Sequence, residues 1–123
     1  MSTVLIVEDD EAVRVLTQSI IEETMGHTGL TAANPEEGKA LLAGDRTIAL
    51  LVTDLDMGGN ALAGVELAKD AVKERPGLPI LYTSAAGVTD GTRALFVPSS
   101  EFLPKPYTVP ELTEAVTRML RAN

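Results

Sequence analysis

The chain reads IALLVTD at residues 48–54, an uninterrupted apolar run that ends in a carboxylate. Such a run, rich in branched apolar side chains, is typical of a strand buried on both faces in a parallel sheet. We therefore predict a strand over residues 48–53, with Asp54 at its carboxyl end.

Four other segments have strand character. Residues 4–7 (VLIV) and 78–83 (LPILYT) are apolar like the run before Asp54. Residues 30–33 and 101–103 are weaker candidates. The sequence therefore predicts five strands.

Helices are predicted between these strands. Apolar residues recur at helical spacing over residues 11–25, and again around residues 65–72. Asn34 before Pro35 is a typical helix start, and the sequence that follows Thr108 repeats this capping pattern. These segments predict four helices.

Residues 87–98 are predicted to form only a short or irregular helix and to be mobile. A glycine such as Gly91 costs about 1 kcal/mol relative to alanine inside a helix. Pro98 disfavours helical backbone at the residue before it. The last helix has no such interruption, and we expect it to end near Arg121.

Strands that alternate with helices predict βαβ units and a parallel sheet. The chain has 123 residues, the size of one ordinary domain. We expect residues 1–123 to form one α/β domain, a three-layer sandwich with five strands between helices. Ligands of such open sheets bind beyond the carboxyl ends of the strands, where the strand order reverses. The residues at those ends are therefore the candidates for function.

Composition narrows the classes of function. The chain has no cysteine, which excludes a disulfide framework, a thiol nucleophile and a cysteine zinc site. A formal net charge of -8 disfavours nucleic acid and anionic membranes as partners. The apolar run at residues 4–7 is too short for a signal peptide, and no stretch approaches membrane-spanning length. We therefore expect a cytoplasmic protein.

Four predicted strands end in polar or charged side chains that a parallel sheet would bring to one edge. These are Glu8, Asp9 and Asp10 after the first strand, Asp54 and Asp56 after the third, Thr83 and Ser84 at the fourth, and Lys105 after the fifth. Mg²⁺ prefers oxygen ligands of this kind and leaves room for a phosphate oxygen. A carboxylate can also attack phosphorus and form an aspartyl phosphate.

Each of these residues also has an ordinary structural reading. An Asp-Asp pair such as Asp9 and Asp10 often caps a helix, and a single lysine is usually solvated. The ordered combination, with one group at each strand end, is what favours phosphoryl chemistry. In that chemistry Lys105 and Mg²⁺ would supply positive charge, and Ser84 would bond a phosphoryl oxygen.

Four motifs resemble the receiver domains of response regulators in two-component signalling. They are residues 7–11 (VEDDE), 51–57 (LVTDLDM), 82–85 (YTSA) and 102–106 (FLPKP). The resemblance covers essentially the whole chain. It implies a flavodoxin-like sandwich with a parallel five-stranded sheet in the order 2-1-3-4-5.

The resemblance also implies a phosphorelay. A histidine kinase or a phosphotransfer protein would donate a phosphoryl group to Asp54. The metal ligands that it implies for Mg²⁺ are Asp9 or Asp10, Asp54, and the backbone carbonyl of Asp56. Ser84 and Lys105 would contact the phosphoryl oxygens.

A switch residue is implied as well. Phe102, three residues before Lys105, occupies the position of the aromatic switch in this family. The phosphoryl group would draw Ser84 toward Asp54, and Phe102 would rotate into the space that is vacated. A downstream protein partner would read the changed surface.

The loop after Asp54 departs from the family pattern. Receivers usually carry proline after the methionine that follows the acceptor, and Gly58 stands there instead. Residues 58–63 form a longer loop than usual, and Asp56 adds a negative charge. We expect these differences to affect the loop geometry and the choice of kinase, but not the acceptor.

Three alternatives remain at this point. Residues 51–56 are also similar to the nucleophile motif of haloacid-dehalogenase-like phosphatases, although no acidic pair follows Lys105 as it does in those enzymes. A binding module that has lost phosphorylation is disfavoured because Asp54 and Lys105 are present. The chain could also be a receiver fragment of a hybrid kinase. Because it contains no output domain, we expect it to signal through protein contact rather than as an enzyme.

Overall fold

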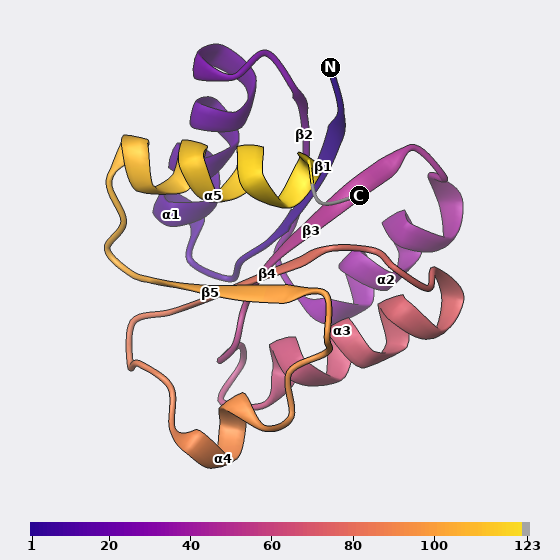
Figure 1. The fold of residues 1–123 in the computed structure, drawn as a ribbon, viewed down its shortest axis with the longest axis vertical. Helices are drawn as coiled ribbons and strands as arrows, with labels where there is room; N and C mark the ends of the chain where they lie inside the picture. The colour runs from indigo at the N-terminus through magenta and orange to yellow at the C-terminus, as the bar shows by residue number, and fades with distance from the viewer. Residues whose placement is uncertain (122–123) are drawn as a thin grey trace.

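Five parallel strands form one sheet in the order β2-β1-β3-β4-β5 in the computed structural model, which describes residues 1–121 (Figure 1). The strands are β1 (Thr3–Val7), β2 (Thr28–Ala32), β3 (Ile48–Asp54), β4 (Ile80–Ser84) and β5 (Ser100–Pro104). The helices are α1 (Glu11–Ser19), α2 (Pro35–Gly44), α3 (Ala63–Glu74), α4 (Asp90–Arg93) and α5 (Val109–Arg121), with a π-helical turn, η1 (Ile20–Thr24), directly after α1. The predicted flavodoxin-like architecture and strand order are confirmed.

Helices cover both faces of the sheet and enclose two cores (Figure 1). Leu5 and Val7 of β1 face the core beneath α2 and α3. The alternate residues, Val4 and Ile6, face the core beneath η1 and α5. All four side chains are fully buried, which is why this strand reads as a continuous apolar run.

The observed boundaries differ from the predicted ones in a few places. β4 begins at Ile80 rather than at Leu78, because Pro79 has no backbone N–H to give to the sheet. The first helix changes its hydrogen bonding at Ile20, whose carbonyl accepts from the N–H of Met25 at 3.1 Å, the spacing of a π-helix. β2 begins earlier than predicted, and β5 is one residue longer at each end.

The predicted helix starts are confirmed by their hydrogen bonds. The side chain of Asn34 accepts from the N–H of Glu37 at 2.9 Å. Oγ1 of Thr108 accepts from the N–H of Glu111 at 3.2 Å, and the Glu111 carboxylate accepts from the N–H of Thr108 at 2.8 Å. This reciprocal pair is a capping box, which fixes the first turn of α5.

The helices differ in length. α5 has 13 residues, whereas α4 has four and buries none of its side chains. The prediction of a short helix in this region is confirmed, and its mobility stays a prediction. No helix within residues 1–121 is long and apolar enough to cross a membrane.

Candidate functional site

Carboxylates meet at one edge of the sheet, where the neighbouring strands β1 and β3 end. β1 is followed by Glu8 and Asp9, and its neighbour β3 ends in Asp54. One carboxylate oxygen from each lies within 4.8 Å of the others, and we call these three residues the acid edge. Glu8 and Asp54 are only 3% and 7% exposed, whereas Asp9 is exposed. Acids held this closely repel one another unless a cation neutralises them.

The residue after β5 brings one cation to the acid edge. Nζ of Lys105 lies 2.8 Å from Oε1 of Glu8 and 3.1 Å from Oδ2 of Asp54. Burial lowers the pKa of Lys105, but the hydrogen bond to Glu8 and the charges of both acids outweigh it and hold that pKa above its ordinary value. For Glu8, burial raises the pKa more than the hydrogen bond from Lys105 lowers it. The ammonium therefore stays charged between its two partners.

β4 lies between β3 and β5 and adds a hydroxyl at the same edge. Thr83 is paired with Asp54 across the sheet, and Ser84 follows it. Ser84 is 4% exposed, and its carbonyl accepts from the N–H of Lys105 at 2.9 Å. Its Oγ accepts a hydrogen bond from the N–H of Ala86 at 3.1 Å, which leaves the hydroxyl proton for another oxygen.

Gly64 fixes the backbone of Asp54 from the side of α3. A Cβ at this position would overlap the carbonyl oxygen of Asp54, so only glycine fits. The N–H of Gly64 donates to the carbonyl of Leu55 at 2.9 Å. The start of α3 therefore packs directly against the chain that carries the buried carboxylate.

Comparison with known protein families identifies the family of this chain. The model of the response regulator receiver domain matches residues 4–117. The chain belongs to this family. The match leaves the phosphatase alternative without support.

Individual relatives agree with that assignment. The DNA-binding transcriptional regulator NtrC of Azospirillum brasilense is 33% identical over 124 residues, which cover 99% of this chain and 25% of that protein. Response regulator MprA of Mycobacterium ulcerans is 30% identical over 119 residues, covering 96% of this chain and 50% of that protein. The receiver therefore spans a quarter to a half of the length of these curated relatives.

Solved structures show the same fold. The receiver domain of the hybrid histidine kinase CckA superposes with a TM-score of 0.78 at 29% identity, covering 97% of this chain and 99% of that chain. The CheY-like receiver domain protein of Methanospirillum hungatei has a TM-score of 0.88 at 24% identity, covering 99% and 95% of the two chains. The second likeness shows the fold alone.

Of the two aspartates singled out after β1 in the sequence, only Asp9 lies in the acid edge. Oδ1 of Asp10 accepts a hydrogen bond from the N–H of Val13 at 3.2 Å and caps α1, so its carboxylate lies outside the acid edge. Glu8, which is not among the metal ligands that the family resemblance implies, lies inside it. A signal is present in the sequence, because Glu8 directly follows an apolar run, as Asp54 does.

The long loop after β3 forms a tight turn above Asp9. Gly58 and Gly59 have φ angles of 60° and 79°, and Met57 and Asn60 pair across them. The N–H of Gly58 donates to Oδ2 of Asp9 at 3.3 Å. A proline, which the family usually carries at this position, is locked near φ -65° and does not fit this turn. The backbone of the longer loop therefore favours glycine at this position.

Phe102, the candidate switch residue, is partly buried on β5. Its ring centroid lies 6.4 Å from that of Phe96, and the guanidinium carbon of Arg93 lies 5.8 Å from it. Phe102 is thus in contact with the region around α4 and not with the acid edge. The exposed side chain of Asp56 lies outside the acid edge as well.

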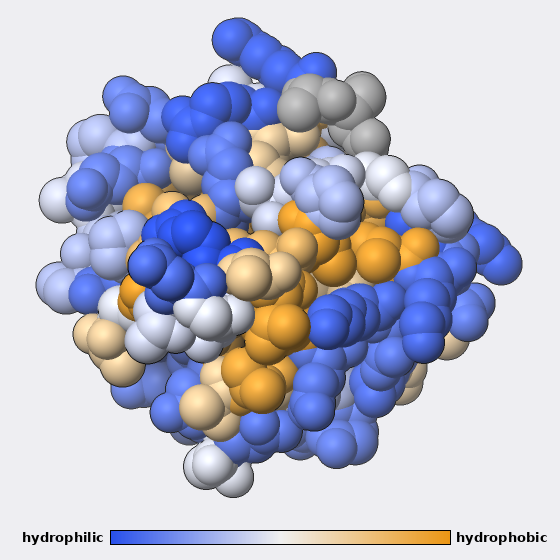
Figure 2. All heavy atoms as spheres, turned by 60° about the horizontal axis from the view of Figure 1, so that its bottom comes forward, coloured by the Kyte–Doolittle hydropathy of each residue, from blue (hydrophilic) through white to orange (hydrophobic). Residues whose placement is uncertain are grey.

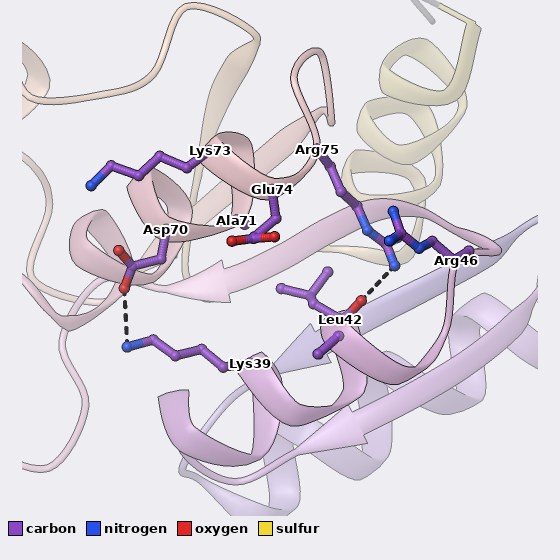
Figure 3. A pocket seen from close by; sticks show the side chains of 9 residues that line it. Lys39, Leu42, Arg46, Asp70, Ala71, Lys73, Glu74 and Arg75 are labelled. Carbon is purple, nitrogen blue, oxygen red and sulfur yellow. Dashed lines mark hydrogen bonds and ion pairs between the residues drawn. The ribbon is translucent and has the colours of Figure 1, made fainter.

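A cavity of about 450 Å³ lies between α2 and α3 (Figure 3). Lys39 on its wall already pairs with a carboxylate of α3 at 3.0 Å. Arg75 donates to the carbonyls of Leu42 at 2.5 Å and Ile48 at 3.1 Å, and thereby ties the end of α2 to the start of β3. Because Ile48 is at the opposite end of β3 from Asp54, the cavity lies away from the acid edge.

Proposed function

We propose that Asp54 accepts a phosphoryl group from a histidine kinase or a phosphotransfer protein. The observation that carries this proposal is its buried carboxylate at the end of a central strand, 3.1 Å from the ammonium of Lys105. A carboxylate can attack phosphorus when cations neutralise the negative charges of the carboxylate and of the phosphoryl group. The acid edge and Lys105 together supply that arrangement.

The donor set of the acid edge fits Mg²⁺. This ion takes one or two carboxylates together with waters and a phosphate oxygen. We assign the ion to Asp9, Asp54 and the backbone carbonyl of Asp56, with Glu8 as a neighbouring acid. Asp10 ranks behind Asp9 because its carboxylate caps α1. When bound, Mg²⁺ would neutralise charge on the phosphoryl oxygens.

The residues of the chain have separate tasks in the transfer. Lys105 orients the Asp54 carboxylate through its contact at 3.1 Å. As the oxygen of Asp54 attacks, an O–P bond forms while the bond from phosphorus to the nitrogen of the donor histidine breaks. Lys105 and the hydroxyl of Ser84 then bond the phosphoryl oxygens, which keeps the product in place.

Exposed apolar side chains on α1 favour a protein, rather than a small molecule, as the phosphoryl donor. Val15 and Leu16 are 53% and 56% exposed on the helix that begins just after the acid edge. Exposed apolar side chains beside a reactive group are a suitable contact for a docking protein. Leu16→Asp should therefore slow transfer from a protein donor and leave transfer from acetyl phosphate unchanged.

The receiver passes on its signal through a change in the shape of its surface. Phosphorylation biases a two-state element that includes Ser84 and Phe102, and a downstream protein binds one of its states more tightly. Figure 2, which brings the α4 end of Figure 1 forward, shows apolar surface between hydrophilic side chains on this face. Such a mixed surface is typical of protein contacts.

Intact mass after incubation with acetyl phosphate and Mg²⁺ tests the acceptor. Wild type should gain one phosphoryl group, and Asp54→Asn should gain none. The matched control is Asp90→Asn, an exposed aspartate at the start of α4, which should be phosphorylated like wild type. An Asp54→Asn protein that is phosphorylated to the wild-type level would refute the assignment.

A second assay separates a signalling domain from a phosphatase. A receiver transfers one phosphoryl group to itself and releases it slowly, so it should not hydrolyse a phosphate ester such as p-nitrophenyl phosphate over many turnovers. Repeated turnover that depends on Asp54 would place the protein among the enzymes.

A further inference from the structure

Three aromatic rings lie together where residues 89–97, which we call the α4 segment, pass over β4 and β5. Tyr82 is fully buried, and the ring of Phe96 stacks on it with centroids 4.1 Å apart. Phe102 lies beside them, 6.4 Å from Phe96. The chain has only two tyrosines and two phenylalanines, so most of its aromatic side chains are gathered at this one contact.

A hydrogen bond also ties the α4 segment to Tyr82. The N–H of Val97 donates to the hydroxyl oxygen of Tyr82 at 3.3 Å. Val97 is the only buried residue of the segment, with 8% exposure. Its N–H would be left without a partner if that oxygen were removed, and such a loss is costly inside a protein. Tyr82 is therefore the principal buried anchor of the segment.

The segment is linked to Phe102 through Arg93. The guanidinium carbon of Arg93 lies 5.9 Å from the ring centroid of Phe96 and 5.8 Å from that of Phe102. A cation is attracted to the faces of both rings at this range. Phe102 therefore cannot move far without changing its contacts with the α4 segment.

The inward path of Phe102 leads beneath the same segment. Phe102 and Tyr82 are paired on neighbouring strands and lie on the same face of the sheet. Ser84, two residues after Tyr82, faces the same side because side chains alternate along a strand. A turn of Phe102 toward Ser84 therefore takes place on the face of the sheet where Phe96 packs on Tyr82.

We propose that Tyr82 is a positioning residue that keeps the α4 segment closed over Phe102 in the unphosphorylated receiver. The inference rests on the proposed phosphorylation of Asp54. Phe102 turns inward when the α4 segment moves away from the sheet, which we call the lifted state. The contacts of Tyr82 set the fraction of molecules in which the α4 segment is lifted. A ligand of Asp54 that prefers the lifted state binds more tightly when that state is more populated. Tyr82 thereby controls the apparent affinity of a site to which it contributes no ligand.

Beryllofluoride with Mg²⁺ is the probe, because it binds an acceptor carboxylate without a covalent step and is visible by ¹⁹F NMR. Tyr82→Phe keeps the stacked ring and removes the oxygen that accepts from Val97. We expect the apparent Kd for beryllofluoride to fall by about three- to tenfold in this variant. Phe96→Leu, which removes the ring stacked on Tyr82, should shift the Kd in the same direction.

The matched control is Tyr107→Phe. Its hydroxyl lies 2.6 Å from Oγ1 of Thr17, and Tyr107 packs against the core on the opposite face of the sheet. This variant loses a hydroxyl of the same kind without touching the α4 segment. Its Kd for beryllofluoride should stay within about twofold of wild type.

Urea unfolding of the same variants separates a switching role from a merely structural one. A Tyr82→Phe receiver that is less stable but binds beryllofluoride as wild type does would overturn the inference. Equal tightening in Tyr107→Phe would overturn it too, because the effect would then not be specific to the α4 segment. A wild-type chain that neither binds beryllofluoride nor takes a phosphoryl group would instead refute the proposed function, and this inference with it.

Discussion

α4 and α5 flank the same edge strand, β5, but they are held against the protein in different ways (Figure 1). The side chains that α5 buries are Leu112, Ala115, Val116 and Met119. α4 buries none, and the segment around it is anchored mainly by Tyr82. α5 is also joined to β5 by an ion pair between Arg118 and Glu101 at 2.7 Å.

This difference indicates which of the two helices can respond to a change at Asp54. Regions with few buried apolar contacts open at lower free energy than the core does. The four buried side chains of α5 give that helix a large share of hydrophobic stabilisation, which α4 lacks. A change at Asp54 should therefore reach the surface through the α4 segment, while α5 serves as the fixed frame.

The largest difference in stability is expected between two variants, one that truncates a leucine of α5 and one that truncates a leucine of the α4 segment. Leu112→Ala leaves a cavity in the core beneath α5 and should lower the free energy of unfolding by about 2–5 kcal/mol. Leu95→Ala removes a side chain that is 38% exposed in the α4 segment, and should cost less than about 1 kcal/mol. Urea unfolding measures both free energies. Equal losses in the two variants would contradict the proposed difference between α4 and α5.

Matched helix caps give a smaller contrast. Thr108 caps α5, and Thr89 caps α4 by accepting from the N–H of Thr92 at 3.1 Å. Thr108→Ala should destabilise the protein by about 1 kcal/mol. Thr89→Ala should cost less than about 0.5 kcal/mol, because so little of the fold depends on α4. Should the Thr89 variant prove the less stable of the two, α4 would be more important to the fold than its burial indicates.

The smallest effect on stability should come from loss of the ion pair between α5 and β5. The hydrogen bond from Arg118 holds the pKa of Glu101 below its ordinary value of 4.5. The pair therefore stabilises the native state above pH 4.5, and this contribution is lost as the pH falls through the lowered pKa. The effect is small because both side chains are exposed and screened by salt.

Thermal unfolding of wild type and Glu101→Gln at several pH values measures that contribution. Wild type should have the higher Tm at neutral pH, and the difference should disappear in acid. A difference in Tm that is unchanged in acid would show that the charge of Glu101 is not its source.

Much of this arrangement is predictable from the sequence. Uninterrupted apolar runs identify buried strands, and a parallel sheet places the residues that follow them at one edge. Together with the family resemblance, these two rules predict that Asp54, Ser84 and Lys105 lie close to one another. The short α4 also follows from local chemistry, because Gly91 and Pro98 act on their own backbone.

The remainder depends on contacts that local patterns do not encode. The sequence predicts Asp9 or Asp10 as the metal ligand after the first strand, but the outcome depends on which carboxylate turns inward and which caps α1. The π-helical turn at Ile20 has no distinct signature in the local sequence. The stack of Phe96 on Tyr82 joins residues from two separate elements, and only the folded structure shows that they meet.

Hydrogen–deuterium exchange read by mass spectrometry tests most directly whether a phosphoryl group on Asp54 acts through the α4 segment. Wild type and Asp54→Asn would be compared with and without acetyl phosphate and Mg²⁺. We predict that phosphorylation of wild type speeds exchange at residues 89–97 by about tenfold and leaves residues 109–121 unchanged, with no response in Asp54→Asn. An equal response at both helices, or the same response in Asp54→Asn, would contradict the account.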